Sequence, residues 1–396
     1  MQCGRPLLLR QPFAPNTFDQ VILGCVNVLA DEMNPARVAA LRLGMGETMT
    51  AFTVQINCGS GMQSIDTAFR YIREGSANLI LAGGAESLSH APLVYSRSAV
   101  NWYAKLFGAR SLGARLAALL AVRPSFFKPV IGLERGLTDP ITDLNMGQTA
   151  ELVAHLFHIT RRQADEYAAE SQQRLAAAQK DGHFAGELEP AIARDGTVFD
   201  YDDGVRPDST ADSLAKLKPA FERPWGKVTP GNSSQITDGA SWVVLASEDA
   251  VREHKLTPRA VIVDSEWSAL DPSIMGLGPV YCSTALLKRH QLALDDIELW
   301  ELNEAFAAQV LGCLAAWEDA EFCRDALGLP VSAGRIPRDR LNVDGGAIGT
   351  GHPVGASGNR IVLHLINAMK RLGKKRGIAT ECIGGGQGGA MLIEAI

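Results

Sequence analysis

Short continuous apolar runs alternate along the chain with segments whose apolar residues recur at helical spacing. Residues 21–24, 52–56 and 79–82 are runs of the first kind and predict buried strands. Residues 34–43 predict a helix between the first two strands. Strands of this type that alternate with helices are typical of a mostly parallel sheet. The pattern therefore predicts an α/β fold in which the third strand ends at the glycine pair 83–84.

The C-terminal third of the chain repeats the plan of the first part. When Gly61 is aligned with Gly358, one offset superposes the apolar positions of the helix that follows each glycine. These positions are Ile65, Ala68, Phe69 and Ile72 in the first part and Val362, Leu365, Ile366 and Met369 in the second. The run 18–24 also matches 297–303. Such a repeat predicts two similar α/β halves.

The repeat is incomplete at the start of the first half. The second half opens with a strand at 259–263 that has no counterpart before residue 18. The first sheet is therefore expected to lack a strand, through either a late start codon or a truncation. Residues 88–231 do not repeat and predict a helical insertion domain, which contains a pronounced helical pattern at 161–180. The run 240–246 then returns to the sheet and closes the first half.

These boundaries and the composition limit the class of protein. The predicted parts are a first half of residues 1–87 and 232–250, an insertion domain of 88–231 and a second half of 251–396, and a chain of 396 residues fits two or three domains. A net charge of -6 gives no reason to expect nucleic acid as a partner. The seven cysteines are scattered without a Cys-x-x-Cys pair, which predicts reduced thiols in a cytoplasmic protein. No apolar run reaches the length of a membrane span, and no signal peptide is recognisable.

Cys58 stands where the second predicted strand stops and a helical pattern begins near Gly59. The free N–H groups of a helix N-terminus would then point toward the sulfur. Such a position stabilises a thiolate and lowers the pKa of a cysteine, which predicts a nucleophile. The alternative is a buried structural cysteine beside a tight glycine turn.

Three further stretches place reactive side chains at the ends of predicted strands. Asn303 and Glu304 interrupt an apolar junction, His352 lies in the glycine-rich loop 345–358, and Cys382 precedes three glycines. Active sites of α/β sheets form at the carboxyl ends of strands, so we expect these residues to converge. The alternatives are a solvated helix cap, a structural histidine and a disulfide between two cysteines.

This set of side chains fits thioester chemistry better than metal binding or redox work. Acyl transfer needs a thiolate to attack a carbonyl, a base to hold that thiolate, and donors for the oxyanion. A second acid or base is needed if a carbon atom is deprotonated. Two cysteines, a histidine, an asparagine and glycine turns offer a candidate for each role.

Four motifs in this order resemble the signatures of the thiolases, the acetyl-CoA acyltransferases and acetyltransferases. They are Asn57-Cys58-Gly59-Ser60-Gly61, Asn303-Glu304-Ala305-Phe306, Gly351-His352-Pro353 with Gly355-Ala356-Ser357-Gly358, and Cys382-Ile383-Gly384-Gly385-Gly386. The similarity runs from about Phe18 to the C-terminus. It implies a layered αβαβα fold made of two similar halves, with a helical insertion in the first half.

The resemblance also implies a role for each reactive residue. Cys58 would take the acyl group of a 3-ketoacyl-CoA, and His352 would hold Cys58 as a thiolate. Cys382 would donate or remove the proton at the α-carbon of the acetyl group. Asn303 would fix a water that binds the enolate oxygen together with the histidine. The backbone N–H groups of Cys58 and Gly384 would form the other oxyanion site.

Further positions match those that bind substrate in the family. The resemblance assigns CoA and acyl-CoA binding to Arg206, Ser234, Met146 and Phe306. It implies no metal or redox cofactor, and it implies a homodimer or homotetramer.

The implied activity is thiolysis of 3-ketoacyl-CoA in fatty acid β-oxidation. Asn145 replaces a histidine that many short-chain members carry, which argues against a preference for acetoacetyl-CoA. The alternatives are a biosynthetic acetoacetyl-CoA-forming acetyltransferase and, because of the missing strand, a catalytically impaired acyl-CoA-binding protein. A decarboxylating ketoacyl synthase is a further alternative, against which Cys382 argues.

Residues 97–135 form a basic amphipathic stretch that is longer than in the simplest family members. They resemble the region found in thiolases that act with a fatty-acid oxidation partner. One interpretation is that the apolar face packs on the insertion domain. The other is docking to an oxidation subunit or to an anionic membrane surface.

Overall fold

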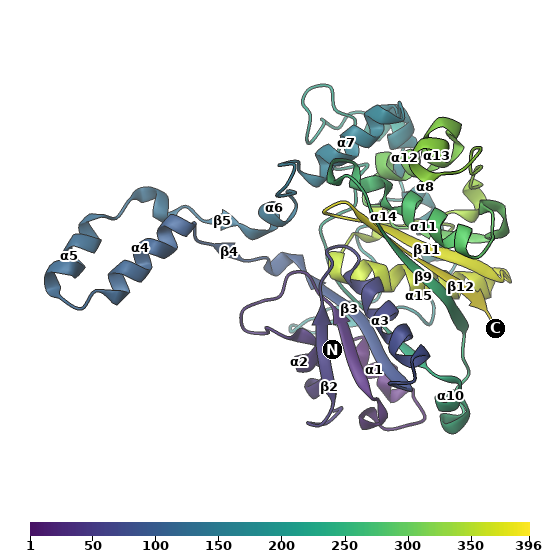
Figure 1. Ribbon diagram of the computed structural model, residues 1–396, viewed down its shortest axis with the longest axis horizontal. Helices are drawn as coiled ribbons and strands as arrows, with labels where there is room; N and C mark the ends of the chain where they lie inside the picture. Colours follow the sequence, from purple (N-terminus) through teal and green to yellow (C-terminus); the bar gives the residue numbers. More distant parts are fainter.

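The computed structural model describes residues 1–396, and two four-stranded sheets form the body of the molecule (Figure 1). The first sheet has the order β2-β1-β3-β8. Its strands are β1 (Gln20–Gly24), β2 (Thr50–Val54), β3 (Leu79–Ser87) and β8 (Asp238–Ala246). β1 lies parallel to β2 and β3, whereas β8 runs antiparallel to β3. β2 therefore ends two residues before the predicted 52–56 run does.

The prediction that β3 ends at its glycine pair is wrong. β3 continues through Gly83 and Gly84 to Ser87, because it pairs with β8 along its whole length. Gly83 faces Trp242 of β8, and a Cβ atom there would lie 2.2 Å from the indole ring. The glycine therefore makes room for a tryptophan on the neighbouring strand rather than stopping the strand.

The second sheet has the order β10-β11-β12-β9, with β10 (Leu299–Leu302), β11 (Arg376–Ile383), β12 (Gln387–Ala395) and β9 (Ala260–Ala269). It repeats the order β1-β3-β8 as β10-β11-β12, but its fourth strand lies beyond β12, and no strand takes the place of β2. β12 corresponds to β8, but β9 has no counterpart beyond β8, so the prediction that the first sheet lacks a strand is confirmed. The prediction of mostly parallel sheets is wrong, since three of the six pairings are antiparallel.

Helices α3 (Ser60–Arg73) and α15 (Val354–Leu372) fill the space between the sheets, where the repeat places them. Their apolar faces form one core with the inward-facing residues of both sheets. This core includes Ile22, Met62, Ile65, Ala68, Ile80, Val362, Leu365, Met369, Ala379 and Met391. Successive residues of a strand point to opposite faces, so neighbouring positions such as Val21 and Leu392 join the outer cores instead.

The two central helices touch backbone to backbone at the glycines that the repeat aligns. A Cβ atom on Gly61 would lie 2.7 Å from the backbone nitrogen of Asn359, and one on Gly358 would lie 2.5 Å from that of Met62. Real Cβ atoms do not approach so closely, so both positions require glycine. The crossing therefore joins the N-terminal turn of α3 to that of α15.

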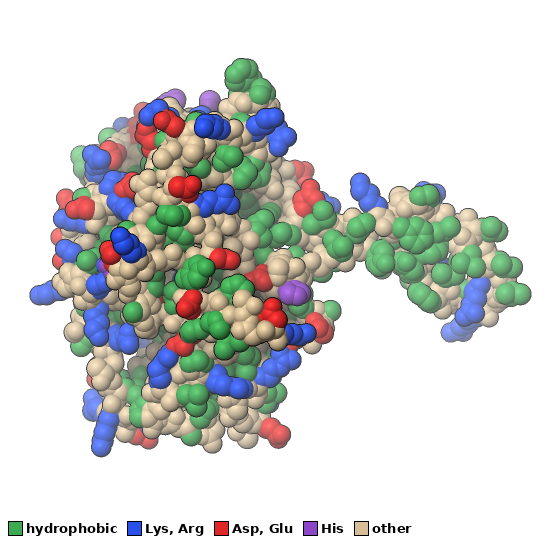
Figure 2. Space-filling model, turned by 180° about the vertical axis from the view of Figure 1, so that it is seen from behind, with side chains coloured by type: hydrophobic (Ala, Val, Ile, Leu, Met, Phe, Trp, Pro, Cys, Tyr) green, Lys and Arg blue, Asp and Glu red, His purple; other side chains and the backbone are tan.

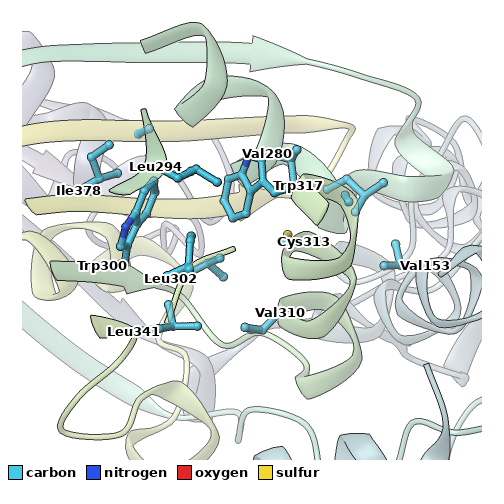
Figure 3. Close-up of a cluster of buried hydrophobic side chains, with 14 of the residues drawn as sticks. Val153, Val280, Leu294, Trp300, Leu302, Val310, Cys313, Trp317, Leu341 and Ile378 are labelled. Carbon is cyan, nitrogen blue, oxygen red and sulfur yellow. The ribbon is translucent and has the colours of Figure 1, made fainter. Parts of the chain in front are cut away.

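Further helices cover the outer faces of the sheets and complete five layers. α1 (Gly4–Leu9) and α2 (Pro35–Arg42) cover the first sheet, and α11 (Gly278–Arg289) and α12 (Ala307–Glu318) cover the second. Figure 3 shows the second outer core, in which Trp300 of β10 packs against Trp317 with ring centroids 5.6 Å apart. The remaining helices here are α10 (Glu248–His254), α13 (Ala320–Leu327) and α14 (Ala347–Thr350).

The segment between β3 and β8 supplies the helices above the second half. α8 (Arg161–Lys180) has the bounds that the sequence predicts, and α7 (Met146–Leu156) packs against α12. Shorter elements are α6 (Gly132–Gly136), α9 (Ala211–Leu214) and the hairpin of β6 (Ala191–Ile192) and β7 (Val198–Phe199). None of the helices in the structure is both long and apolar enough to cross a membrane.

An arm of residues 92–132 projects from the body (Figure 1). Its stalk is the two-stranded pair β4 (Leu93–Val94) and β5 (Val130–Ile131), and its tip holds α4 (Arg97–Gly108) and α5 (Leu112–Leu120). The interpretation in which this stretch packs its apolar face on the insertion domain is wrong, because most of its large apolar side chains are exposed and the buried ones pack within the arm.

Candidate active site

A tight turn between β2 and α3 presents Cys58. Asn57 adopts the left-handed conformation with φ of 47°, and its side-chain amide donates to the Gly384 carbonyl over 2.7 Å. The Ser60 hydroxyl donates to the Asn57 carbonyl over 2.7 Å and accepts from the Ile56 N–H over 2.9 Å. A residue outside its favoured backbone region persists where its surroundings hold it. These bonds therefore fix the cysteine at the N-terminus of α3, as the sequence predicts.

In the arrangement of side chains that the structure shows, the thiol of Cys58 is protonated. Burial raises the pKa of Cys58 to about 12, and this outweighs the backbone N–H of Gly384, which is directed at the sulfur and lowers the pKa. The expectation of a lowered pKa at the helix N-terminus is therefore wrong for this arrangement. The thiolate would lose more hydration than the N–H groups replace.

Cys382 reaches the same place from the end of β11. Its side chain is buried in an apolar cluster with Met275, and Met146 and Phe306 pack against this cluster. Burial first, and then the neighbouring thiol of Cys58, raise the pKa of Cys382 well above its ordinary value. All seven cysteines are free thiols, and no group of three or more His, Cys, Asp or Glu side chains is placed to hold a metal ion.

His352 is held from both sides in the loop before α15. Its backbone N–H donates to the Gln235 carbonyl over 2.9 Å, and its Nδ1 lies 2.6 Å from the Ser357 hydroxyl. Burial lowers the pKa of His352 to about 4, so the imidazole is neutral. Its other ring nitrogen, Nε2, is buried without a hydrogen-bond partner. A histidine that only supports the fold would have both nitrogens satisfied.

The contacts of Ser357 define the tautomer of His352 that can act as a base. The Ser357 hydroxyl has one proton and lies 3.2 Å from the Pro353 carbonyl, to which it can only donate. In that arrangement Nδ1–H of the imidazole donates to Ser357, and Nε2 carries the free lone pair. The unpartnered nitrogen is then ready to accept a proton.

Asn303 and Glu304 are buried at the end of β10, so the alternative of a solvated helix cap is wrong. The Asn303 backbone N–H donates to the Thr380 carbonyl over 2.9 Å, and its side-chain Oδ1 has no partner. Its side-chain nitrogen lies 3.4 Å from Nδ1 of His352, which brings the amide beside the imidazole.

Glu304 fixes this junction through hydrogen bonds from three side chains. Its carboxylate accepts from Tyr167 over 2.8 Å, from Ser171 over 2.6 Å and from Asn342 over 3.1 Å. A Cβ atom on Gly346 would lie 2.6 Å from the same carboxylate, so a glycine is needed for the close approach. The glutamate therefore ties the Asn303 loop to α8 and to the loop that leads to His352.

We expect Glu304→Ala to destabilise the fold strongly. The change leaves the buried hydroxyls of Tyr167 and Ser171 without an acceptor, at a cost of about 1 to 3 kcal/mol for each. Thermal and urea unfolding measure the loss. The control is Glu166→Ala on the exposed face of α8, where the side chain pairs only with the exposed Arg162 and the expected loss is below about 1 kcal/mol. Equal stability of the two variants would show that Glu304 does not hold the junction.

The structure brings three of the four expected CoA-binding residues to the site. Met146 and Phe306 line the cluster around Cys382, and the Ser234 N–H donates to the Ala305 carbonyl over 3.0 Å. The side chain of the fourth, Arg206, is exposed and has no hydrogen-bond partner among the site residues. Its backbone N–H donates to Gln172 instead, over 2.8 Å.

Sequence reasoning missed two residues that hold the imidazole. In the sequence Ser357 stands out only as part of a glycine motif, and Gln235 does not stand out at all, although both contact His352. The serine could have been found from its spacing, since a residue five positions after His352 faces back over the first turn of a helix. The glutamine acts through its backbone carbonyl, for which a side chain gives no signal.

Comparison with known proteins agrees with this geometry. A family model for the thiolase N-terminal domain matches residues 2–249, and one for the thiolase C-terminal domain matches residues 256–395. A probable acetyl-CoA acyltransferase of Staphylococcus epidermidis is 36% identical over 98% of this chain and 90% of its own length. A beta-ketoadipyl-CoA thiolase of Pseudomonas aeruginosa is 39% identical over 96% of this chain and 88% of its own length.

Solved structures agree as well. Human mitochondrial 3-ketoacyl-CoA thiolase in complex with CoA superposes with a TM-score of 0.84 at 36% identity, over 99% of this chain and 90% of that chain. The Bacillus anthracis acetyl-CoA acetyltransferase gives a TM-score of 0.84 at 35% identity, over 100% of this chain and 92% of that chain. These relatives define the protein as an acyltransferase. The chain belongs to the thiolase family.

Proposed function

We propose that this chain catalyses CoA-dependent thiolysis of 3-ketoacyl-CoA to acetyl-CoA and a shortened acyl-CoA. The observation that carries the proposal is that the thiols of Cys58 and Cys382 are neighbours, while the imidazole of His352, with its free Nε2, adjoins Asn303 at the end of the strand next to β11. Claisen condensation uses the same steps in the opposite order. Each residue named by the sequence receives a role in these steps.

In the first step the sulfur of Cys58 attacks the C3 ketone carbon of the substrate. Nε2 of His352 takes the thiol proton as the carbon–sulfur bond forms, which it can do because its low pKa leaves it neutral. The backbone N–H groups of Cys58 and Gly384 stabilise the oxyanion on C3. The raised pKa of the thiol then matters less, since the proton moves only when the substrate is in place.

In the second step the C2–C3 bond breaks, and its electron pair passes to the acetyl part as an enolate. Protonated His352 and a water held by Asn303 stabilise the enolate oxygen, for which the unpartnered Oδ1 of Asn303 can orient that water. The thiol of Cys382 donates its proton to C2, and acetyl-CoA leaves. The remaining acyl group stays on Cys58 as a thioester.

In the last step CoA replaces the enzyme in that thioester. The Cys382 thiolate first recovers its proton from protonated His352, and the neutral imidazole then takes the proton of the CoA thiol as the CoA sulfur attacks the acyl carbonyl. The Cys58 sulfur leaves and recovers a proton from His352. All groups return to their starting protonation states, so the cycle needs no further reactant.

CoA lies along the loops that carry Ser234 and Arg206 in this proposal. Arg206 is exposed and free to meet a phosphate, whereas Ser234 is close to the reacting groups through Ala305. Met146 and Phe306 form the apolar wall that meets the pantetheine or acyl part.

The chain works in fatty acid β-oxidation and prefers medium or long acyl chains over acetoacetyl-CoA. In support, Asn145 is occupied in capping α7, where its side chain accepts from the Gly147 N–H over 3.0 Å. The test is CoA-dependent loss of the 3-ketoacyl-CoA enolate absorbance across a series of chain lengths, with 3-oxoadipyl-CoA as an added member. We expect kcat/KM to rise from acetoacetyl-CoA to the medium-chain substrates.

Two other outcomes would replace this proposal. Highest kcat/KM on acetoacetyl-CoA, with efficient condensation of acetyl-CoA, would indicate a biosynthetic acetyltransferase. Binding of acyl-CoA without turnover of any substrate would indicate an impaired acyl-CoA-binding protein.

The active form in this proposal is a homodimer or homotetramer. β2 is the edge strand of the first sheet, and it ends four residues before Cys58. An edge strand offers unpaired backbone groups to a second copy of the same strand. Light scattering of the purified chain measures the assembly.

A further inference from the structure

The arm of residues 92–132 is a folded unit that makes few contacts with the body. Its stalk pairs Leu93 with Ile131 and Val94 with Val130. At its tip, Trp102 and Phe126 are buried together, and the indole N–H of Trp102 donates to the Ala118 carbonyl over 2.8 Å. α4 and α5 therefore hold each other in a defined shape rather than forming an irregular loop.

Most of the large apolar side chains of the arm face outward. Leu120 is 87% exposed, Phe107 77% and Leu112 76%. On α5 the exposed leucines recur at helical spacing and form one continuous apolar face, made up of Leu112, Leu116, Leu119 and Leu120. A surface of this kind is costly in water and indicates a binding partner.

The charges of the arm are all positive. No aspartate or glutamate occurs between Glu86 and Glu134, although the whole chain has a net charge of -6. The arm carries six cations, none of which forms a salt bridge, namely Arg97, Lys105, Arg110, Arg115, Arg123 and Lys128. Figure 2 shows hydrophobic and basic side chains gathered on the arm, while acidic ones are spread over the body. The partner is therefore both anionic and apolar.

We propose that the arm docks on an anionic lipid bilayer, with the leucine face of α5 and Phe107 in the acyl-chain boundary and the cations against the headgroups. An amphipathic helix with leucine and phenylalanine on one side and basic residues beside them binds such a surface. Two arms from different copies would bring like charges together, which disfavours arm-to-arm pairing as the explanation of the apolar face.

The docking proposal rests on the proposed thiolysis and adds that the reaction takes place at a membrane surface. It is argued from residues of the arm, which are distinct from those of the active site. None of the arm residues contributes to the site around Cys58, so activity on a soluble short-chain substrate is independent of the arm. For long acyl chains, an enzyme at the bilayer would meet substrate that is itself partitioned into lipid.

The test is flotation of the full chain with phosphatidylcholine vesicles that contain or lack phosphatidylglycerol. We expect binding only to the anionic vesicles, and weaker binding at high salt. Arg110→Glu with Arg115→Glu should lower the partition coefficient by about tenfold or more. The reason is that the attraction of each cation to the anionic headgroups changes this coefficient by roughly fivefold. Leu116→Ser with Leu120→Ser should lower it similarly through lost apolar contact.

Matched controls separate docking from general charge and from folding. Arg252→Glu with Arg324→Glu makes the same charge change on exposed helices of the body, and it should leave flotation unchanged. All variants should have the same rate of acetoacetyl-CoA thiolysis and the same circular dichroism spectrum as the original chain. Equal binding to neutral and anionic vesicles, no binding to either, or an equal loss in the body control would overturn the proposal. A change of oligomeric state in the leucine variant, without vesicle binding by the original chain, would identify a second copy as the occupant and also overturn it.

Discussion

Replacement of Cys58 by Ala is expected to lower the rate of thiolysis by at least about four orders of magnitude, because no other thiol can form the covalent intermediate. Incubation of the original chain with acyl-CoA, followed by peptide mass analysis, should place the acyl group on the peptide that contains Cys58. Because burial raises the pKa of this thiol to about 12, its alkylation rate without substrate should keep increasing as the pH rises above neutrality.

Cys3→Ala is the matched control, since Cys3 is a free thiol that lies outside the site. It should leave the rate of thiolysis and the acyl labelling unchanged. An acyl group on Cys382 in place of Cys58 would reverse the roles of the two thiols. An alkylation rate that reaches its plateau below neutral pH would show that the thiolate already exists in the resting enzyme.

Replacement of Cys382 by Ser is expected to separate the two kinds of chemistry. Transfer of an acyl group from a saturated acyl-CoA to Cys58 breaks no carbon–carbon bond and should persist. Thiolysis of 3-ketoacyl-CoA should fall by about 10³-fold, since protonation of C2 loses its acid. Exchange of labelled CoA into acetyl-CoA measures the first reaction, and enolate absorbance measures the second.

The control for this variant is Cys313→Ser, which makes the same change at a fully buried cysteine of α12. It reports the cost of a buried hydroxyl without a role in the reaction. If Cys382→Ser reduced exchange and thiolysis equally, Cys382 would act on both steps and the division proposed for the two thiols would be wrong.

Most of the fold could be predicted from local patterns of apolar and polar residues in the sequence. The bounds of α8 follow from apolar spacing, and the alignment of Gly61 with Gly358 starts from a shared Ser-Gly pair and is supported by four apolar positions that coincide at the same offset. The direction of β8 and β12 could not be predicted, since a short apolar run reads the same in a parallel and an antiparallel pair.

The sequence predicts only those site residues whose side chains are themselves chemically reactive. Cys58, His352 and Cys382 stand out because they are reactive groups among glycines. The protonation of Cys58 was predicted wrongly, because a helix N-terminus is visible in sequence whereas the depth of burial that outweighs it depends on distant elements. The carbonyl of Gln235 and the exposure of the arm likewise depend on how segments far apart in the chain meet.

The glycine crossing of α3 and α15 sets a mechanical tolerance for the reaction. Cys58 lies three residues before Gly61 on one side of the contact, and His352 lies six residues before Gly358 on the other. The two backbones are in contact, and a Cβ atom on either glycine would push them apart. The contact between the two glycines therefore sets the distance between the nucleophile and the base. A displacement of about 1 Å can cost about a hundredfold in rate. The geometry of the reacting groups in this enzyme therefore depends on Gly61 and Gly358, which take no chemical part in the reaction.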